Sequence, residues 1–280
     1  MTSNTMEIQP LTPWIGAEIL GVDLTRPLSN EQVEAIHQAF LKYLVIFFRD
    51  QDLDFASHEA LSRHFGELHL PPALAPFRVP DHPGIVKLHI DEKSVRVPGE
   101  LWHSDMSCDA EPPLGSILYL HTVPKVGGDT AFASMYAAYD ALSDRMKQQL
   151  EGLNAIHDAR ASLALAETLN TVDEEKRSTA KFPRSSHPVI RTHPETKRKT
   201  IYVNKSFTTH IEGIPKAESE ALLNYLYEHG RQEEFQCRFR WRPNSIAFWD
   251  NRAAQHKAIW DYHPQTRSGY RTQICGDKPF

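Results

Sequence analysis

The spacing of apolar residues along the chain predicts a small number of helices. Residues 29–44 carry apolar side chains at i, i+3, i+4 and i+7 spacing, which is typical of a helix with one buried face. Ser29 and Gln32 stand at capping-box spacing and predict where this helix begins. Further helices are predicted at 55–65, ended by Gly66, at 134–153 with a break near Ser143, and at 214–230.

Short apolar and alternating segments predict strands between these helices. The clearest is "CRFRWR", in which Cys237, Phe239 and Trp241 alternate with three arginines, so one face is buried and the other meets water. The predicted strands are 44–48, 85–89, 116–123, 188–192, 200–204, 237–242, 246–249 and 270–275. Because they do not alternate regularly with helices, they favour an antiparallel sandwich or barrel decorated by α-helices over a βαβ fold.

One segment, 167–186, is polar and charged and has no convincing period. Two interpretations stay open for it: a mobile surface loop, or a lid over an active site. The sequence has no internal repeat and no linker, so we expect residues 1–280 to form a single domain.

Composition restricts the class of protein. Hydrophobic residues make up 40% and charged residues 24% of the chain, and the net charge is −5, which gives no reason to expect nucleic acid or a membrane as partner. The longest apolar run near the start, 44–48, is too short to cross a bilayer, and "MTSNTMEIQP" lacks the apolar core of a signal peptide. Three widely spaced cysteines suit reduced thiols. We therefore expect a cytoplasmic location.

Metal chemistry is the class that the motifs leave open, because the chain has no G-x-S-x-G, P-loop or H-E-x-x-H motif. Two His-x-Asp pairs occur, at His103 and Asp105 and at His89 and Asp91. On an extended segment such a pair points to one face and can offer two adjacent ligands. With 15 histidines in the chain, about one such pair is expected by chance, so context has to decide.

The context favours His103. It lies in "WHSD", upstream of a predicted strand and of "GGDT", whereas His89 ends a strand and leads into a polar turn. His256 follows another predicted strand, with Arg267 and Arg271 further along the chain. Two histidines and one carboxylate on one face are the ligand set of non-haem Fe(II) oxygenases, and arginines behind such a site indicate a bound anion. Each arginine taken alone would more often be a surface cation.

Several stretches together resemble the taurine dioxygenase (TauD/TfdA) family of Fe(II)/2-oxoglutarate-dependent dioxygenases over nearly the whole chain. They are "IGAEILGVDLTRPLS", "FFRDQ", "HFGELH", "WHSD", "GGDT", "HPVIRTHPETKRKTIYVN", "WDNRAAQH" and "GDKPF". The resemblance implies a mainly β fold, a double-stranded β-helix or jelly roll with α-helices around it. It also implies Fe(II) as cofactor, 2-oxoglutarate and O₂ as cosubstrates, and succinate and CO₂ as products.

Residue roles follow from the same resemblance. It implies that His103, Asp105 and His256 hold the iron, and that Thr130 and Arg267 hold the distal carboxylate of 2-oxoglutarate. The residues that it places around the substrate are Arg271, at the anionic group, and His69, Met106 and Phe207, along the pocket.

Departures from the family pattern bear on the substrate. Where taurine-specific members have a His, a Tyr and an Asn, this chain has Pro71, Leu74 and Gly99. A site without those polar contacts no longer selects for the groups they bind. We therefore expect the substrate to be a small anion with a hydrophobic body, of the sulfonate, sulfate ester or aryloxyalkanoate class. We also expect the enzyme to be a homo-oligomer. The alternatives are a taurine dioxygenase proper, a non-oxidative metal-dependent jelly-roll enzyme, or a binding protein without turnover.

Overall fold

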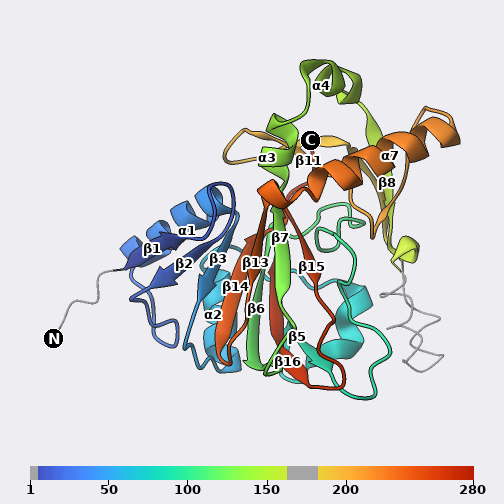
Figure 1. The fold of residues 1–280 in the computed structure, drawn as a ribbon. Helices are drawn as coiled ribbons and strands as arrows, with labels where there is room; N and C mark the ends of the chain where they lie inside the picture. Colours follow the sequence, from blue (N-terminus) through green and yellow to red (C-terminus); the bar gives the residue numbers. More distant parts are fainter. Residues whose placement is uncertain (1–5, 163–181) are drawn as a thin grey trace.

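An eight-stranded sheet and a three-stranded sheet that faces it form the centre of the fold. The computed structural model describes residues 6–162 and 182–280 (Figure 1). The large sheet has the order β1-β2-β3-β14-β6-β16-β5-β4. Its strands are β1 (Glu7–Pro10), β2 (Ala17–Leu20), β3 (Val45–Phe48), β4 (Arg78–Val79), β5 (His82–Ile90), β6 (Gly115–Thr122), β14 (Ser245–Asp250) and β16 (Arg267–Ile274).

The facing sheet has the order β13-β7-β15, and smaller units surround the two sheets. Its strands are β13 (Gln236–Phe239), β7 (Thr130–Ser134) and β15 (Ala254–Ala258). Another sheet, β12-β8-β9, consists of β12 (Thr208–Ile211), β8 (Asn154–Asp158) and β9 (Arg184–Pro188), and β10 (Ile190–Thr192) forms a hairpin with β11 (Lys199–Ile201). The helices are α1 (Asn30–Tyr43), α2 (Phe55–Arg63), α3 (Met135–Asp140), α4 (Asp144–Leu150) and α7 (Lys216–Gly230), with short 3-10 turns at Pro72–Phe77, Ala159–Ala161 and Glu233–Phe235.

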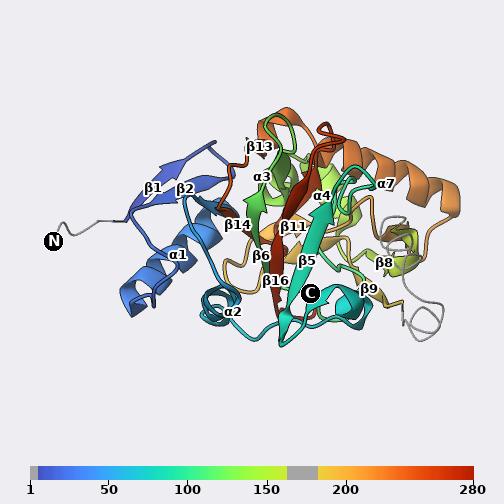
Figure 2. The ribbon, with the colours of Figure 1, turned by 90° about the horizontal axis from the view of Figure 1, so that it is seen from below.

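Strand β3 shows how the apolar pattern builds these layers. Ile46 and Phe48 belong to a core that includes Phe40 of α1, whereas Val45 and Phe47 belong to the core between the two sheets. Because successive side chains of a strand point to opposite faces, a four-residue run of apolar residues is buried on both sides. Figures 1 and 2 show α1 beside β1–β3, and α3, α4 and α7 on the other side of the molecule.

Pairing between segments that are distant in the sequence gives the jelly roll. Strand β14 pairs antiparallel with β3 and β6, β16 pairs with β5 and β6, and β7 pairs with β13 and β15. The predicted fold class is confirmed, since the molecule is mainly β with helices around two facing sheets. In this arrangement, residues from the middle of the chain and from its C-terminal third line one cavity.

The predicted elements agree with the structure in most places. Ser29 caps α1 in a capping box with Gln32, and Ser143 caps α4 at the predicted break. Helix α2 ends at Arg63, before Gly66, and α7 still includes Gly230. Strand β16 begins at Arg267, earlier than predicted. The strands that were not predicted are β1, β2, β4, β7, β8, β9, β12 and β15.

The predicted lid at 167–186 lies largely outside the described residues. Of that segment the structure describes only 182–186, where β9 begins. All three cysteines are unpaired, as their spacing indicated. Among the described residues, none of the helices combines the length and the apolar character needed to cross a membrane.

Candidate active site

Three side chains with the chemistry of metal ligands meet inside the jelly roll. His103, Asp105 and His256 are all buried, and one potential ligand atom of each lies within 4.8 Å of the others. The two imidazole rings have centroids 4.1 Å apart, and Nε2 of His103 is 3.6 Å from Oδ1 of Asp105. Within the part of the chain that is described, this is the one group of three such residues.

Backbone pairing brings the two histidines together. The amide of His103 donates to the carbonyl of His256 at 3.1 Å, and the amide of His256 donates back to the carbonyl of His103 at 2.8 Å. His256 follows strand β14, as predicted, and itself lies within β15. The His-x-Asp spacing suggested that both residues lie on an extended strand. Asp105 instead lies in a turn that follows the single bridge at His103. The sequence spacing thus identified His103 and Asp105 as a pair, and the turn orients the Asp105 side chain.

Asp105 is the most strongly held member of the triad. Ser116 donates to its Oδ2 at 2.6 Å, and Arg271 donates from Nη1 to its Oδ1 at 2.9 Å. Asn251 accepts from the Asp105 amide at 3.1 Å and donates to the Ser116 hydroxyl at 3.0 Å. Burial alone raises the pKa of Asp105, but Arg271 and the two histidines hold it well below its usual value. The carboxylate is therefore ionised at neutral pH.

One nitrogen of each histidine is available to a metal. Nδ1 of His103 donates to the carbonyl of Leu101 at 2.8 Å, so Nε2 is the nitrogen of this ring that can bind a metal. Burial, followed by the neighbouring His103, holds the pKa of His256 well below its usual value, so this ring is neutral. Nδ1 of His256 is buried without a hydrogen-bond partner among the described residues. Two imidazoles and one carboxylate fit a divalent transition metal.

Arg267 marks a second site in the same cavity. Its guanidinium is buried, and Nη2 donates to the Thr130 hydroxyl at 3.3 Å, with the indole ring of Trp241 5.4 Å away. Among the described residues no carboxylate lies within 4.0 Å of it, and its Nε has no partner. A buried cation with only a neutral partner is costly unless an anion joins it.

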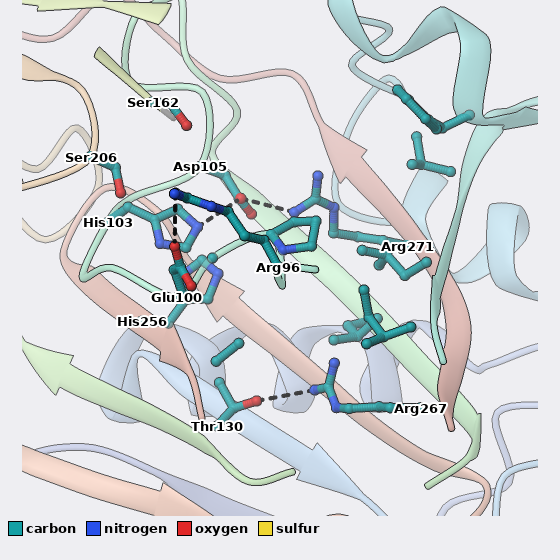
Figure 3. Close-up of a pocket in the computed structure, with 18 of the residues that line it drawn as sticks. Arg96, Glu100, His103, Asp105, Thr130, Ser162, Ser206, His256, Arg267 and Arg271 are labelled. Carbon is teal, nitrogen blue, oxygen red and sulfur yellow. Dashed lines mark hydrogen bonds and ion pairs between the residues drawn. The ribbon is translucent and has the colours of Figure 1, made fainter. Parts of the chain in front are cut away.

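The Thr130 hydroxyl is oriented toward such an anion. Its oxygen accepts from Trp241 Nε1 at 2.9 Å as well as from Arg267. Since a hydroxyl has one hydrogen and two lone pairs, two accepted bonds leave its own hydrogen to be donated elsewhere. Arg267 and Thr130 together can therefore hold a carboxylate (Figure 3).

A cavity of about 480 Å³ contains both sites. Of the residues predicted around the substrate, Met106, Phe207 and Arg271 line it. His69 does not: its Nε2 lies 3.2 Å from Oδ2 of Asp109. The other lining residues that the sequence comparison singled out are Leu74 and Gly99, whereas Pro71 is not among them.

His89, the rival ligand, lies apart from the triad although it lines the same cavity. Its side chain is 45% exposed and pairs with Asp91 at 3.5 Å. The predicted polar turn supplies Asp91 as a carboxylate partner for His89, so this second His-x-Asp is a contact between neighbouring residues near the surface.

Sequence reasoning missed several residues of the site. Trp241 was assigned to the core from its alternation, and Ser116 and Asn251 had no signal of their own because a lone Ser or Asn carries none. Arg96 and Glu100 also line the cavity, in a segment that was interpreted as a solvated turn. Only their i, i+4 spacing pointed to a pair.

The fold and the site define a jelly-roll protein with a buried His/Asp/His group that could hold a metal and an adjacent buried arginine that could hold an anion. The family model "Taurine catabolism dioxygenase TauD, TfdA family" matches residues 7–273, and the chain belongs to this family.

Individual relatives agree with that assignment. The chain is 31% identical to a putative alpha-ketoglutarate-dependent sulfonate dioxygenase of Schizosaccharomyces pombe, covering 100% of this chain and 72% of the relative. It is 32% identical to the alpha-ketoglutarate-dependent 2,4-dichlorophenoxyacetate dioxygenase of Cupriavidus pinatubonensis, covering 89% and 90%. The crystal structure of a putative alpha-ketoglutarate-dependent taurine dioxygenase from Burkholderia xenovorans superposes with a TM-score of 0.85 at 37% identity, covering 98% and 94%.

Proposed function

We propose that this chain is an Fe(II)- and 2-oxoglutarate-dependent dioxygenase that hydroxylates a small anionic organic substrate and releases succinate and CO₂. The observation that carries the proposal is the pairing of two features in one cavity, the buried triad and the buried Arg267. A metal hydrolase or isomerase needs only the first of these. A 2-oxoglutarate enzyme needs both, because its cosubstrate is a dicarboxylate.

His103, Asp105 and His256 would hold the metal through Nε2 of His103, the Asp105 carboxylate and an imidazole nitrogen of His256. When bound, Fe(II) supplies the activation of O₂ and the oxidation of 2-oxoglutarate. The protein keeps the ligands in their binding forms, since Ser116 and Arg271 fix the ionised carboxylate.

Arg267 and Thr130 would bind the distal carboxylate of 2-oxoglutarate. The guanidinium gains the anion that its burial requires, and the Thr130 hydroxyl donates the hydrogen that its two accepted bonds leave over. Trp241 fixes both groups, so the other end of the cosubstrate is directed along the cavity toward the triad.

The substrate would occupy the remaining part of the cavity. Arg271 would contact its anionic group, while Met106 and Phe207 would offer apolar surface. Ring centroids of Phe207 and His103 are 6.4 Å apart, so this apolar wall adjoins the metal site. His69 is not placed for such a contact, because it is engaged with Asp109. We further propose that the chain forms one domain and self-associates.

Succinate release tests the proposal. Purified protein with Fe(II), 2-oxoglutarate and O₂ should release succinate in response to a substrate from a panel of sulfonates, sulfate esters and aryloxyalkanoates. Omission of O₂, of 2-oxoglutarate or of iron should each stop it. Turnover without O₂ would favour a non-oxidative metal enzyme, and taurine as the best substrate of the panel would favour a taurine dioxygenase proper.

A further inference from the structure

The segment from Arg96 to Glu100 is fixed against the metal site by two anchors. Val97 is buried in a small core with Ile90 and Tyr262. The carbonyl of Gly99 accepts from the amide of Ala258 at 2.8 Å, two residues beyond His256 on β15. The segment therefore has a fixed position at the cavity although it contains no helix or strand.

Gly99 lets this segment approach a ligand histidine closely. Its φ is +85°, a value that residues with a side chain rarely adopt, and a Cβ atom there would lie 3.0 Å from Cε1 of His103 and 3.6 Å from its Nε2. Backbone thus lies against the edge of His103 that carries Cε1 and Nε2. Because position 99 offers no side chain, polar contacts in this part of the cavity have to come from its neighbours.

Arg96 and Glu100 are those neighbours. Both line the cavity, and their side chains form an ion pair at 3.5 Å, with 38% and 32% of the side chains exposed. In the view of Figure 3, the guanidinium groups of Arg96 and Arg271 lie on either side of Asp105, whereas Arg267 lies at the other end of the cavity. The cavity is therefore lined by two arginines besides the one assigned to 2-oxoglutarate.

We propose that Arg96 is a second anion-recognition residue and that it makes the pocket favour a sulfonate or sulfate over a carboxylate. One guanidinium fork matches the two oxygens of a carboxylate. A sulfonate or sulfate ester presents three oxygens, so a second donor on the other side gains a contact that a carboxylate cannot offer. Glu100 keeps Arg96 at the cavity until the anion arrives.

This inference rests on the proposed function and selects within it. The two curated relatives described above, one named for sulfonate and one for a phenoxyacetate, are almost equally similar to this chain, so overall similarity does not choose between the anions. The position and the guanidinium group of Arg96 instead favour the sulfonate or sulfate over the carboxylate.

The experiment compares two probes of equal chain length, octanesulfonate and nonanoate. Their affinities are measured anaerobically by calorimetry on protein loaded with Fe(II) and 2-oxoglutarate. Wild type should bind the sulfonate more tightly. Arg96→Ala should weaken sulfonate binding about tenfold or more and change nonanoate binding little, because a charge-assisted contact is lost for one probe only. Arg96→Lys, which keeps the charge without the fork, should fall between the two.

Lys93→Ala is the matched control, since Lys93 is an exposed cation that lines the same cavity. It should leave both affinities nearly unchanged. The inference is overturned if Arg96→Ala does not affect sulfonate binding, if it weakens both probes equally, or if Lys93→Ala has the same effect. Failure of wild type to bind 2-oxoglutarate would instead overturn the proposed function and this inference with it. Arg96→Gln gives a second readout if the alanine variant unfolds.

Discussion

At the residue scale, the hydrogen-bond and ion-pair partners of each aspartate distinguish a proposed metal ligand from a surface residue. Asp105 and Asp91 both follow a histidine by two positions, but Asp105 is buried with Ser116 and Arg271, whereas Asp91 meets half-exposed His89. A buried carboxylate needs several donors to stay ionised. The surroundings, rather than the tripeptide, therefore distinguish the proposed metal ligand.

The two pairs lead to opposite expectations for iron binding. His103→Ala should abolish Fe(II) binding in an anaerobic calorimetric titration, because two ligands remain where three are needed. His89→Ala should leave the iron affinity nearly intact. Asp105→Ala and His256→Ala should behave like His103→Ala. Equal loss of iron in the His89 and His103 variants would contradict the assignment.

Arg267 gives the corresponding prediction for 2-oxoglutarate. A charge-assisted contact to a buried anion contributes about 1.5–3 kcal/mol, so Arg267→Ala should weaken 2-oxoglutarate binding about tenfold or more. An anaerobic titration of the Fe(II)-loaded protein measures it. Arg63→Ala, which removes an exposed arginine at the end of α2, is the control and should bind normally. An unchanged affinity in Arg267→Ala would exclude this role.

At the scale of elements, the turn between β14 and β15 joins the metal site to the scaffold. Asn251 in this turn contacts the Asp105 amide and Ser116 of β6, while its neighbours Asp250 and Arg252 form a buried ion pair. Asp250 also pairs with His193 at the β10–β11 hairpin at 3.0 Å. Asp105, which is not on a strand, is thus held by Asn251 of this turn and Ser116 of β6, and the turn itself is held by the β10–β11 hairpin.

Removal of the Ser116 hydroxyl tests whether these contacts hold the Asp105 carboxylate in place. Ser116→Ala should lower Fe(II) affinity about 10- to 100-fold, because the carboxylate loses a donor that orients it. Ser62→Ala removes a buried hydroxyl that bonds Thr272 at 2.6 Å, and neither residue lines the cavity. Both variants should lose stability by about 1–3 kcal/mol on thermal unfolding. Equal iron affinity in the two variants would refute a positioning role for Ser116.

Elements with a strong local pattern could be predicted from sequence, and others could not. The amphipathic α1 and the alternating "CRFRWR" strand follow directly from their spacing. Strand β7 was missed because all five of its residues are buried, which removes the alternation, and β15 carries few of the side chains that favour strands. The support of Asp105 by Asn251 depends on contacts 146 positions apart, which no local pattern records.

At the scale of the whole molecule, burial of histidines makes the fold sensitive to acid. Burial lowers the pKa of His58 in α2 to about 4 and that of His157 in β8 to about 3. Both rings are neutral in the folded protein, and both become free to take up a proton once it unfolds. They lie in different parts of the structure, one behind the large sheet and one in the β12-β8-β9 sheet, so acid weakens both.

The sign and size of the His58 contribution follow from its pKa values. Above the ordinary value of 6.5 neither state is protonated, and between 6.5 and about 4 only the unfolded state takes up the proton, so stability falls as the pH falls through this window. Between about pH 7 and pH 5 the loss is about 2 kcal/mol. His58→Gln should remove that part of the loss in urea unfolding at the two pH values, whereas His64→Gln, at an exposed position beyond the same helix, should keep it. If the His58 variant lost as much stability on acidification as wild type, burial of this ring would not be a source of the acid sensitivity.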